Sequence, residues 1–232
     1  MYEKIDKIIS FYKFIQIDNL DNIRDTIFQS MRDLSILGTI ILAKEGINVN
    51  ICGASKNISA AKKYFSKKID LTDTHYNESF IEDRVFTKLK VKIKKEIIKA
   101  GFEISKSIVA KNTSLDPREW DALLKRKPVI IDMRNRFEYS LGTFNNSENL
   151  GLINFSDLKV QLNNAKDIDK ERDIAIFCTG GIRCEKAAVT LRECGFKNIF
   201  QLKGGIINYI ENGDQKSEWQ GSCFVFDDRI SI

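Results

Sequence analysis

A cysteine followed by two glycines and an arginine is the stretch of this sequence best suited to chemistry. The apolar segment Asp173–Phe177 leads directly into Cys178, and Gly180 and Gly181 follow before a helix expected from Cys184. In this arrangement the backbone N–H groups of the loop and the positive end of the helix point to one sulfur. Such surroundings lower the pKa of a thiol and favour the thiolate, which is the reactive form. The segment therefore predicts a nucleophilic cysteine at position 178.

Few other residues compete for this role. His75 is the single histidine and lies about 100 residues before Cys178, which disfavours Ser-His-Asp and Cys-His catalysis. No two cysteines have C-x-x-C spacing, which disfavours a zinc site and a disulfide framework; they are Cys52, Cys178, Cys184, Cys194 and Cys223. We therefore expect backbone amides, the helix dipole and Arg183 to activate Cys178, with no metal and no organic cofactor identified.

The spacing between the cysteine and the arginine distinguishes two kinds of loop. Cysteine phosphatases have five residues between these positions, and their loop fits a phosphate group. Here four residues separate Cys178 from Arg183, and Cys184 occupies the position that a phosphatase arginine would take. The shorter loop favours a thiolate or a persulfide sulfur over a tetrahedral phosphate. Whether Cys184 is a second reactive thiol or a structural residue stays open.

The second half of the chain alternates short apolar strands with helices. The expected strands cover 129–132, 173–177 and 198–202, and the expected helices cover 116–125, 135–141, 156–163, 184–194 and 205–211. This order predicts an α/β domain with a mainly parallel sheet. Ligands of such sheets bind at the carboxyl ends of the strands, where Cys178 is expected.

The first half predicts a different architecture. Its expected strands cover 11–17, 38–43, 47–52, 75–80 and 88–98, and its expected helices cover about 20–34 and 56–68. The order β-α-β-β-α-β indicates a ferredoxin-like α+β domain. We expect this domain over 1–100, a linker over 101–113, the α/β domain over 114–212 and a C-terminal segment over 213–232.

The positive charge of the chain is concentrated in the first half. The net charge is +5, and residues 1–112 contain 20 Lys and Arg against 14 Asp and Glu. Four lysines alternate with apolar residues, which places them on one face of a strand: Lys88, Lys90, Lys92 and Lys94. Such a row favours contact with a polyanion such as RNA. The alternative is protection of an edge strand against aggregation.

The composition indicates a cytoplasmic protein without a membrane segment. No run of residues reaches the roughly 18 apolar residues of a membrane helix. The start of the chain, Met1–Asp6, lacks the basic and then apolar order of a signal peptide.

Three motifs in order resemble a rhodanese domain: the cysteine loop, Asp132–Tyr139 before it and Leu202–Gly205 after it. Together with Gly38–Asn48, Lys90–Ile97 and Trp219–Asp227, they make nearly the whole chain similar to the bacterial tRNA uridine(34) hydroxylase family. The resemblance implies an N-terminal acylphosphatase-like (ferredoxin-like) domain joined to a rhodanese-like α/β domain. It also implies oxygen-dependent 5-hydroxylation of the wobble uridine, with the tRNA anticodon loop as partner and an unknown reductant.

The same resemblance assigns roles to residues of the loop. Cys178 matches the family's essential cysteine, which is described as a persulfide intermediate. The predicted substrate cradle is made by five backbone amides, those of Thr179, Gly180, Gly181, Ile182 and Arg183.

Two other functions fit parts of the sequence. The first is a small-molecule sulfurtransferase of the thiosulfate type, and the second is a non-catalytic sulfur carrier or RNA-binding module. A simple sulfurtransferase does not need a basic companion domain, and the intact loop disfavours a non-catalytic module. The oligomeric state, the set of tRNAs and the electron donor are not determined by the sequence.

Overall fold

The computed structural model describes residues 6–164, 168–213 and 218–232, and these residues form two compact units. The first unit runs to Ile97 and includes Asp227–Arg229, and the second comprises Ile98–Phe226 and Ile230–Ile232. The prediction about a signal peptide concerns the start of the chain, and residues 1–5 lie outside the described residues. The same is true of residues 214–217, which belong to the predicted C-terminal segment. The domain limits at 100, 113 and 212 stay predictions.

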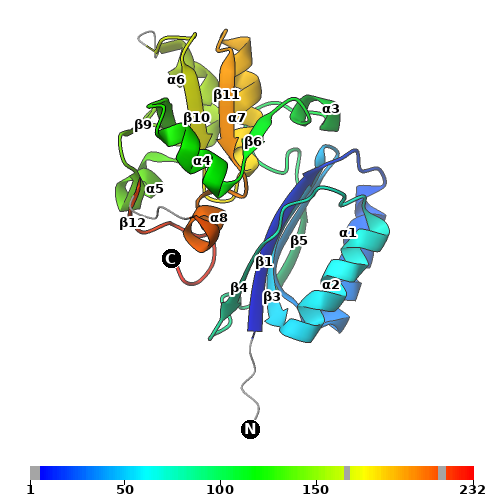
Figure 1. Cartoon of the computed structure of the whole chain (residues 1–232). Helices are drawn as coiled ribbons and strands as arrows, with labels where there is room; N and C mark the ends of the chain where they lie inside the picture. The colour runs from blue at the N-terminus through cyan, green and yellow to red at the C-terminus, as the bar shows by residue number, and fades with distance from the viewer. Residues whose placement is uncertain (1–5, 165–167, 214–217) are drawn as a thin grey trace. The chain divides into compact units, whose positions relative to one another are not determined.

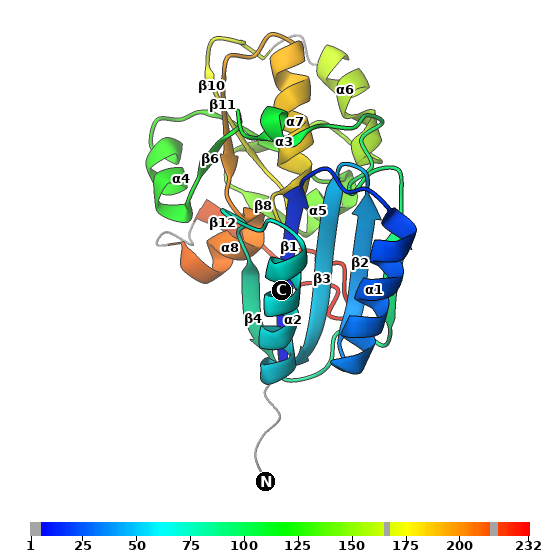
Figure 2. The same ribbon diagram turned by 90° about the vertical axis from the view of Figure 1, so that its right-hand side faces the viewer.

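The first unit contains a five-stranded sheet in the order β4-β1-β3-β2-β5, with α1 and α2 side by side on one face (Figures 1 and 2). Its elements are β1 (Asp6–Phe14), α1 (Leu20–Asp33), β2 (Leu37–Ala43), β3 (Gly46–Ala54), α2 (Ser55–Lys68), β4 (Asn77–Ile81) and β5 (Leu89–Ile93). The pairing is antiparallel except between β2 and β5. This confirms the predicted ferredoxin-like arrangement, with β5 as an added edge strand.

Two strands of this unit differ from their predicted ranges. β1 begins at Asp6 and ends at Phe14, earlier than the predicted 11–17, because residues 6–14 pair along their whole length with β3. β5 ends at Ile93, whereas the predicted strand ran to residue 98. Its partner β2 stops at Ala43, and the Lys94 N–H donates the last ladder bond to the Leu42 carbonyl. Strand length is thus limited by the partner.

The second unit is built on a fully parallel sheet in the order β6-β11-β10-β7-β9, as Figure 1 shows for its central strands. The strands are β6 (Thr113–Leu115), β7 (Val129–Asp132), β9 (Ser147–Asn149), β10 (Asp173–Phe177) and β11 (Asn198–Leu202). A separate antiparallel pair joins β8 (Gly142–Phe144) to β12 (Trp219–Gly221). The parallel α/β sheet predicted for this half is confirmed.

Helices cover both faces of this sheet. Leu158 and Leu191 of α6 and α7 pack against one face, and Trp120 and Tyr209 of α4 and α8 pack against the other. The helical segments are α3 (Lys106–Val109), α4 (Pro117–Leu124), α5 (Arg136–Leu141), the 3-10 turn Phe155–Asp157, α6 (Leu158–Asn164), α7 (Ile182–Glu193) and α8 (Gly205–Asn212). α7 begins two residues before the expected Cys184, because Gly181 adopts a left-handed conformation (φ 96°) directly before it.

Candidate active site

Cys178 is the first residue after β10, at the carboxyl end of a central strand. The chain then turns through Gly180 and Gly181 into α7, so that the start of the helix lies beside the cysteine. The Cys178 side chain is 0% exposed, and the half-exposed residues of the loop are Gly180 and Ile182. The structure therefore gives the thiol the strand–loop–helix setting that the sequence predicts.

Several donors converge on the Cys178 sulfur. The Gly181 N–H donates to Sγ at 3.1 Å, and the N–H groups of Arg183 and Cys184 also bond to it. Burial raises the pKa of the Cys178 thiol, but a hydrogen bond from the Cys184 thiol, the Arg183 charge and the two N–H groups together lower it to about 6. At neutral pH the sulfur is therefore mostly thiolate.

Cys184 is a hydrogen-bond donor in this site. Burial raises the pKa of the Cys184 thiol well above its ordinary value, and the neighbouring Cys178 thiolate raises it further. Of two adjacent buried thiols, Cys178 therefore ionises first and Cys184 keeps its proton. Sequence reasoning left the role of Cys184 open, because six residues of separation do not show whether the two sulfurs meet.

The Arg183 guanidinium is paired with a carboxylate inside the site. Its Nη1 and Nη2 donate to the two oxygens of Glu138 at 2.6 and 2.9 Å, and Nη2 also donates to Thr179 Oγ1 at 3.0 Å. Burial raises the pKa of Glu138, but the bonds and charge of Arg183 outweigh it, so the pKa of this carboxyl is lowered. The ion pair fixes a positive charge beside Cys178.

Glu138 is a site residue to which sequence reasoning gave no role. It lies in α5 and is 0% exposed, and its Oε2 accepts the Asn135 N–H at 3.1 Å. The signal available in the sequence was the Asn-x-x-Glu pattern of a helix start, which explains the local position of Glu138 but not its partner. The contact with Arg183 spans 45 residues and depends on the packing of α5 near the loop.

Thr179, another residue of the predicted cradle, takes part in the loop through its side chain and its carbonyl. Thr179 uses its hydroxyl, which donates to Glu138 Oε1 at 3.2 Å. Its carbonyl and that of Cys178 accept the N–H groups of Ile207 and Ile206 at 3.1 and 3.0 Å. The first turn of α8 therefore holds the outer side of the loop. Asp132 orders the neighbouring loop by accepting from Arg134 through both carboxylate oxygens.

The four predicted lysines belong to the first unit, whereas Cys178 belongs to the second. Lys90 and Lys92 lie on β5, an edge strand, and Lys88 and Lys94 flank it; all four side chains are exposed. Leu89 and Val91 pack against the core beneath the helices. The lysines therefore point away from that core, as the alternation predicts.

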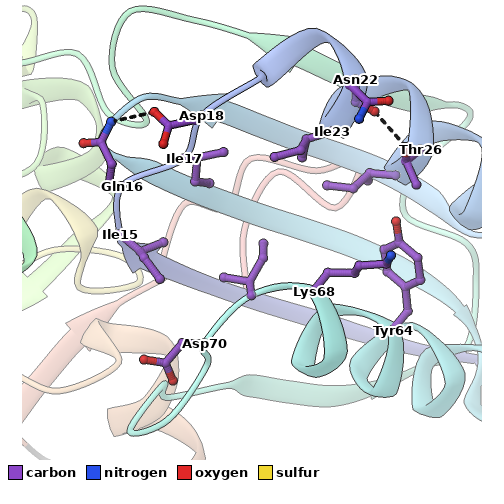
Figure 3. Close-up of a pocket in the computed structure, with 12 residues that line it drawn as sticks. Ile15, Gln16, Ile17, Asp18, Asn22, Ile23, Thr26, Tyr64, Lys68 and Asp70 are labelled. Carbon is purple, nitrogen blue, oxygen red and sulfur yellow. Dashed lines mark hydrogen bonds between the residues drawn. The ribbon is translucent and has the colours of Figure 1, made fainter.

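The first unit also contains a pocket of about 290 Å³ between α1, α2 and the segment after β1 (Figure 3). Ile15, Ile17 and Ile23 give it apolar walls, and Tyr64 and Lys68 approach from α2. None of the predicted site residues lines it.

Two general features of the described residues bear on chemistry and location. Within them, no three side chains of His, Cys, Asp or Glu gather in a way that would hold a metal ion. Within the same ranges, no helix has the length and apolar character of a membrane span.

Each half of the chain matches the model of a known domain family. Residues 7–97 match the UPF0176 acylphosphatase like domain, and residues 116–212 match the Rhodanese-like domain. A solved structure of a rhodanese-related protein from Thermoplasma volcanium has 28% sequence identity and a TM-score of 0.37, covering 44% of this chain and 93% of that one.

Two relatives that match 97% of this chain have the same name. The tRNA uridine(34) hydroxylase of Legionella pneumophila is 38% identical over 227 residues, which is 97% of this chain and 89% of the relative. That of Pelagibacter ubique is 42% identical over 232 residues, which is 97% of this chain and 74% of the relative. The chain belongs to the tRNA uridine(34) hydroxylase family.

Proposed function

We propose that this protein hydroxylates carbon 5 of the uridine at position 34 of tRNA, with molecular oxygen as co-substrate and Cys178 as the catalytic residue. The observation that carries the proposal is the Cys178 thiol, whose pKa is lowered to about 6 within a loop of backbone donors. The name shared by these two relatives supports this substrate. A tRNA substrate implies that the protein works in the cytoplasm.

The chemistry of uracil explains why a thiolate is useful here. Carbon 5 is a weak nucleophile, but addition of a thiolate at carbon 6 converts carbon 5 into an enolate carbon. This carbon takes up oxygen and a proton to form a hydroperoxide. Two thiol equivalents from an external reductant then reduce the hydroperoxide to an alcohol and water and form a disulfide. Loss of the carbon 5 proton and of the Cys178 sulfur leaves 5-hydroxyuridine.

The burial of Cys178 favours a version of this reaction that uses a persulfide. A persulfide extends the reactive group by a second sulfur about 2 Å from Sγ, which lengthens the reach of the buried Cys178. In this version the outer sulfur adds to carbon 6, and the loop amides of Thr179, Gly180, Gly181, Ile182 and Arg183 form the cradle around it. Both versions require Cys178.

We assign RNA binding to the lysines of the first unit. Lys88, Lys90, Lys92 and Lys94 form an exposed row of like charges, which phosphate groups neutralise on binding. The anticodon loop supplies unpaired bases for the cysteine loop, and the backbone phosphates around it supply the negative charge.

The direct test is mass spectrometry of tRNA nucleosides from cells that lack their own uridine(34) hydroxylase. Expression of this protein is expected to restore 5-hydroxyuridine or its derivatives, and Cys178→Ser is expected to abolish this. Cys194→Ser changes a half-exposed cysteine at the end of α7 and serves as the matched control. A Cys178→Ser protein that still restores the modification contradicts the proposal. Unchanged tRNA combined with transfer of sulfur from thiosulfate to cyanide supports a sulfurtransferase instead.

A further inference from the structure

Three phenylalanine rings form a row in the second unit, and two of them are largely exposed. Phe137 is 48% exposed and Phe226 is 64% exposed, with the half-buried Phe224 between them. The ring centroids of Phe137 and Phe224 are 5.1 Å apart, and those of Phe224 and Phe226 are also 5.1 Å apart, each pair at 86°. We call Phe137, Phe224 and Phe226 the aromatic row.

The local sequence fixes the direction of two of these rings. Burial alternates along residues 223–226: Cys223 and Val225 are buried, whereas Phe224 and Phe226 are partly and largely exposed. Backbone bonds hold this segment in place: Cys223 and Ile232 exchange two N–H to carbonyl bonds, and the Val225 N–H donates to the Ile230 carbonyl. The buried alternate residues already anchor the segment, so the exposure of Phe226 is not explained by packing.

The aromatic row contacts the candidate active site through Phe226, and Phe137 is the sequence neighbour of a site residue. The Phe226 ring lies over the Arg183 guanidinium, with 5.8 Å from the ring centroid to Cζ. Phe137 directly precedes Glu138, which pairs with that same guanidinium. Arg183 in turn is one of the groups that hold Cys178 as a thiolate. The row is therefore adjacent to the loop of the reactive sulfur.

We propose that the aromatic row is a stacking surface for the unpaired bases next to the uridine that reacts at Cys178. This inference rests on the proposed function and adds the residues that hold the RNA. Unpaired bases in RNA loops are commonly bound by stacking on aromatic side chains. The exposed faces of Phe137 and Phe226 provide such contacts without any base-specific hydrogen bond, so the surface accepts neighbours of different sequence.

Binding of an RNA hairpin that has the anticodon stem and loop, with uridine at position 34, tests the proposal without chemistry. Phe226→Leu and Phe137→Leu keep apolar bulk but remove the ring, and each is expected to weaken binding about five-fold to a hundred-fold. Phe226→Trp keeps a ring and is expected to bind like the unaltered protein. Phe28→Leu, which changes a similarly exposed phenylalanine of α1, is the matched control and is expected to change nothing.

A fluorescent adenine analogue, 2-aminopurine, placed beside position 34 reports stacking directly. Its fluorescence is expected to be quenched by the unaltered protein and by Phe226→Trp, and not by Phe226→Leu. The midpoint of the Cys178 titration and the thermal denaturation temperature are expected to stay unchanged in the leucine variants, which separates stacking from damage to the site.

Each outcome decides between the two proposals. If both leucine variants bind the hairpin and quench the probe as the unaltered protein does, the aromatic row is not a stacking surface, even when 5-hydroxyuridine is formed. If the leucine variants lose binding but the unaltered protein forms no 5-hydroxyuridine, the stacking surface stands and the hydroxylase proposal fails. Absence of hairpin binding by the unaltered protein overturns the stacking proposal.

Discussion

Cys178 is a buried thiol whose ionisation depends on its neighbours and not on solvent. Burial opposes the thiolate, and the Cys184 thiol, the Arg183 charge and the N–H groups of both residues more than offset this penalty. The result resembles the balance at other reactive cysteines, where amides and a nearby cation replace water.

The titration of Cys178 follows from this balance. Thiolate absorbance near 240 nm is expected to rise with a midpoint at about pH 6, and Cys178→Ser is expected to remove this step. Hydroxylation is expected to fall as the pH is lowered through the same midpoint, because protonation removes the nucleophile. Cys184→Ala removes a donor to the thiolate and is expected to move the midpoint upward. A midpoint near 9 in the unaltered protein contradicts this account.

The buried pair of Arg183 and Glu138 predicts a large effect on stability. Glu138→Gln leaves the guanidinium buried without its counter-charge and is expected to lower the free energy of unfolding of the second unit by about 3 kcal/mol. Both tryptophans, Trp120 and Trp219, belong to this unit, so tryptophan fluorescence in urea measures its unfolding. Glu148→Gln on β9 is exposed and is expected to change less than about 0.5 kcal/mol. Equal effects of the two changes would show that the pair contributes nothing.

At the scale of elements, the cysteine loop is held between two helix starts. The start of α7 points its amides inward to the sulfur, and the first turn of α8 donates to the carbonyls of Cys178 and Thr179. This packing requires close approach of backbones, and Gly205 permits it. A Cβ on Gly205 would clash with the carbonyl oxygens of Cys178 and Thr179.

Gly205→Ala is therefore expected to lower the free energy of unfolding more than Gly151→Ala does. Gly205 has φ +67° and Gly151 has φ +68°, but a Cβ on Gly151 would meet nothing within 4 Å. Gly151→Ala is expected to cost about 1–2 kcal/mol for the left-handed conformation. Gly205→Ala adds the clash, is expected to cost about 2–5 kcal/mol in total, and displaces the loop. Urea unfolding and the Cys178 titration measure both effects, and identical losses for the two variants would contradict the role given to α8.

At the scale of the whole molecule, the proposed binding of RNA phosphate groups and the activation of the thiol are assigned to different units. The lysine row belongs to the first unit and the cysteine loop to the second. This division predicts that charge can be removed from one unit without altering the chemistry of the other.

The double change Lys90→Gln and Lys92→Gln tests this division. It is expected to weaken tRNA binding and to lower the slope of log K against log salt by about 0.7–0.9 for each phosphate group that the protein no longer neutralises. The Cys178 titration is expected to stay the same. Lys63→Gln on α2 is also exposed and serves as the control for removal of a positive charge. An unchanged salt slope together with aggregation of the double variant would favour edge protection as the role of the lysines.

Local patterns in the sequence were sufficient to predict most elements and the place of Cys178 directly after a strand. The strands 129–132, 173–177 and 198–202 are found with the predicted bounds, because short apolar runs between turns leave little freedom. The errors at β1 and β5 have one cause, which is that the length of a strand depends on its partner. That partner is distant in the sequence, so its end cannot be read locally.

The sequence by itself determined the position of Cys178 after a buried strand, the glycine-containing loop after it, the parallel sheet and the alternation of lysines. All of these depend on neighbours within a few residues, through strand and helix periodicity and the conformations open to glycine. Only the tertiary structure decided that Cys184 donates to Cys178, that Arg183 is paired with Glu138, and that three phenylalanines from α5 and the C-terminal segment meet beside the loop. These contacts need side chains from elements distant in the sequence, or the orientation of a thiol in a packed interior, and local pattern specifies neither.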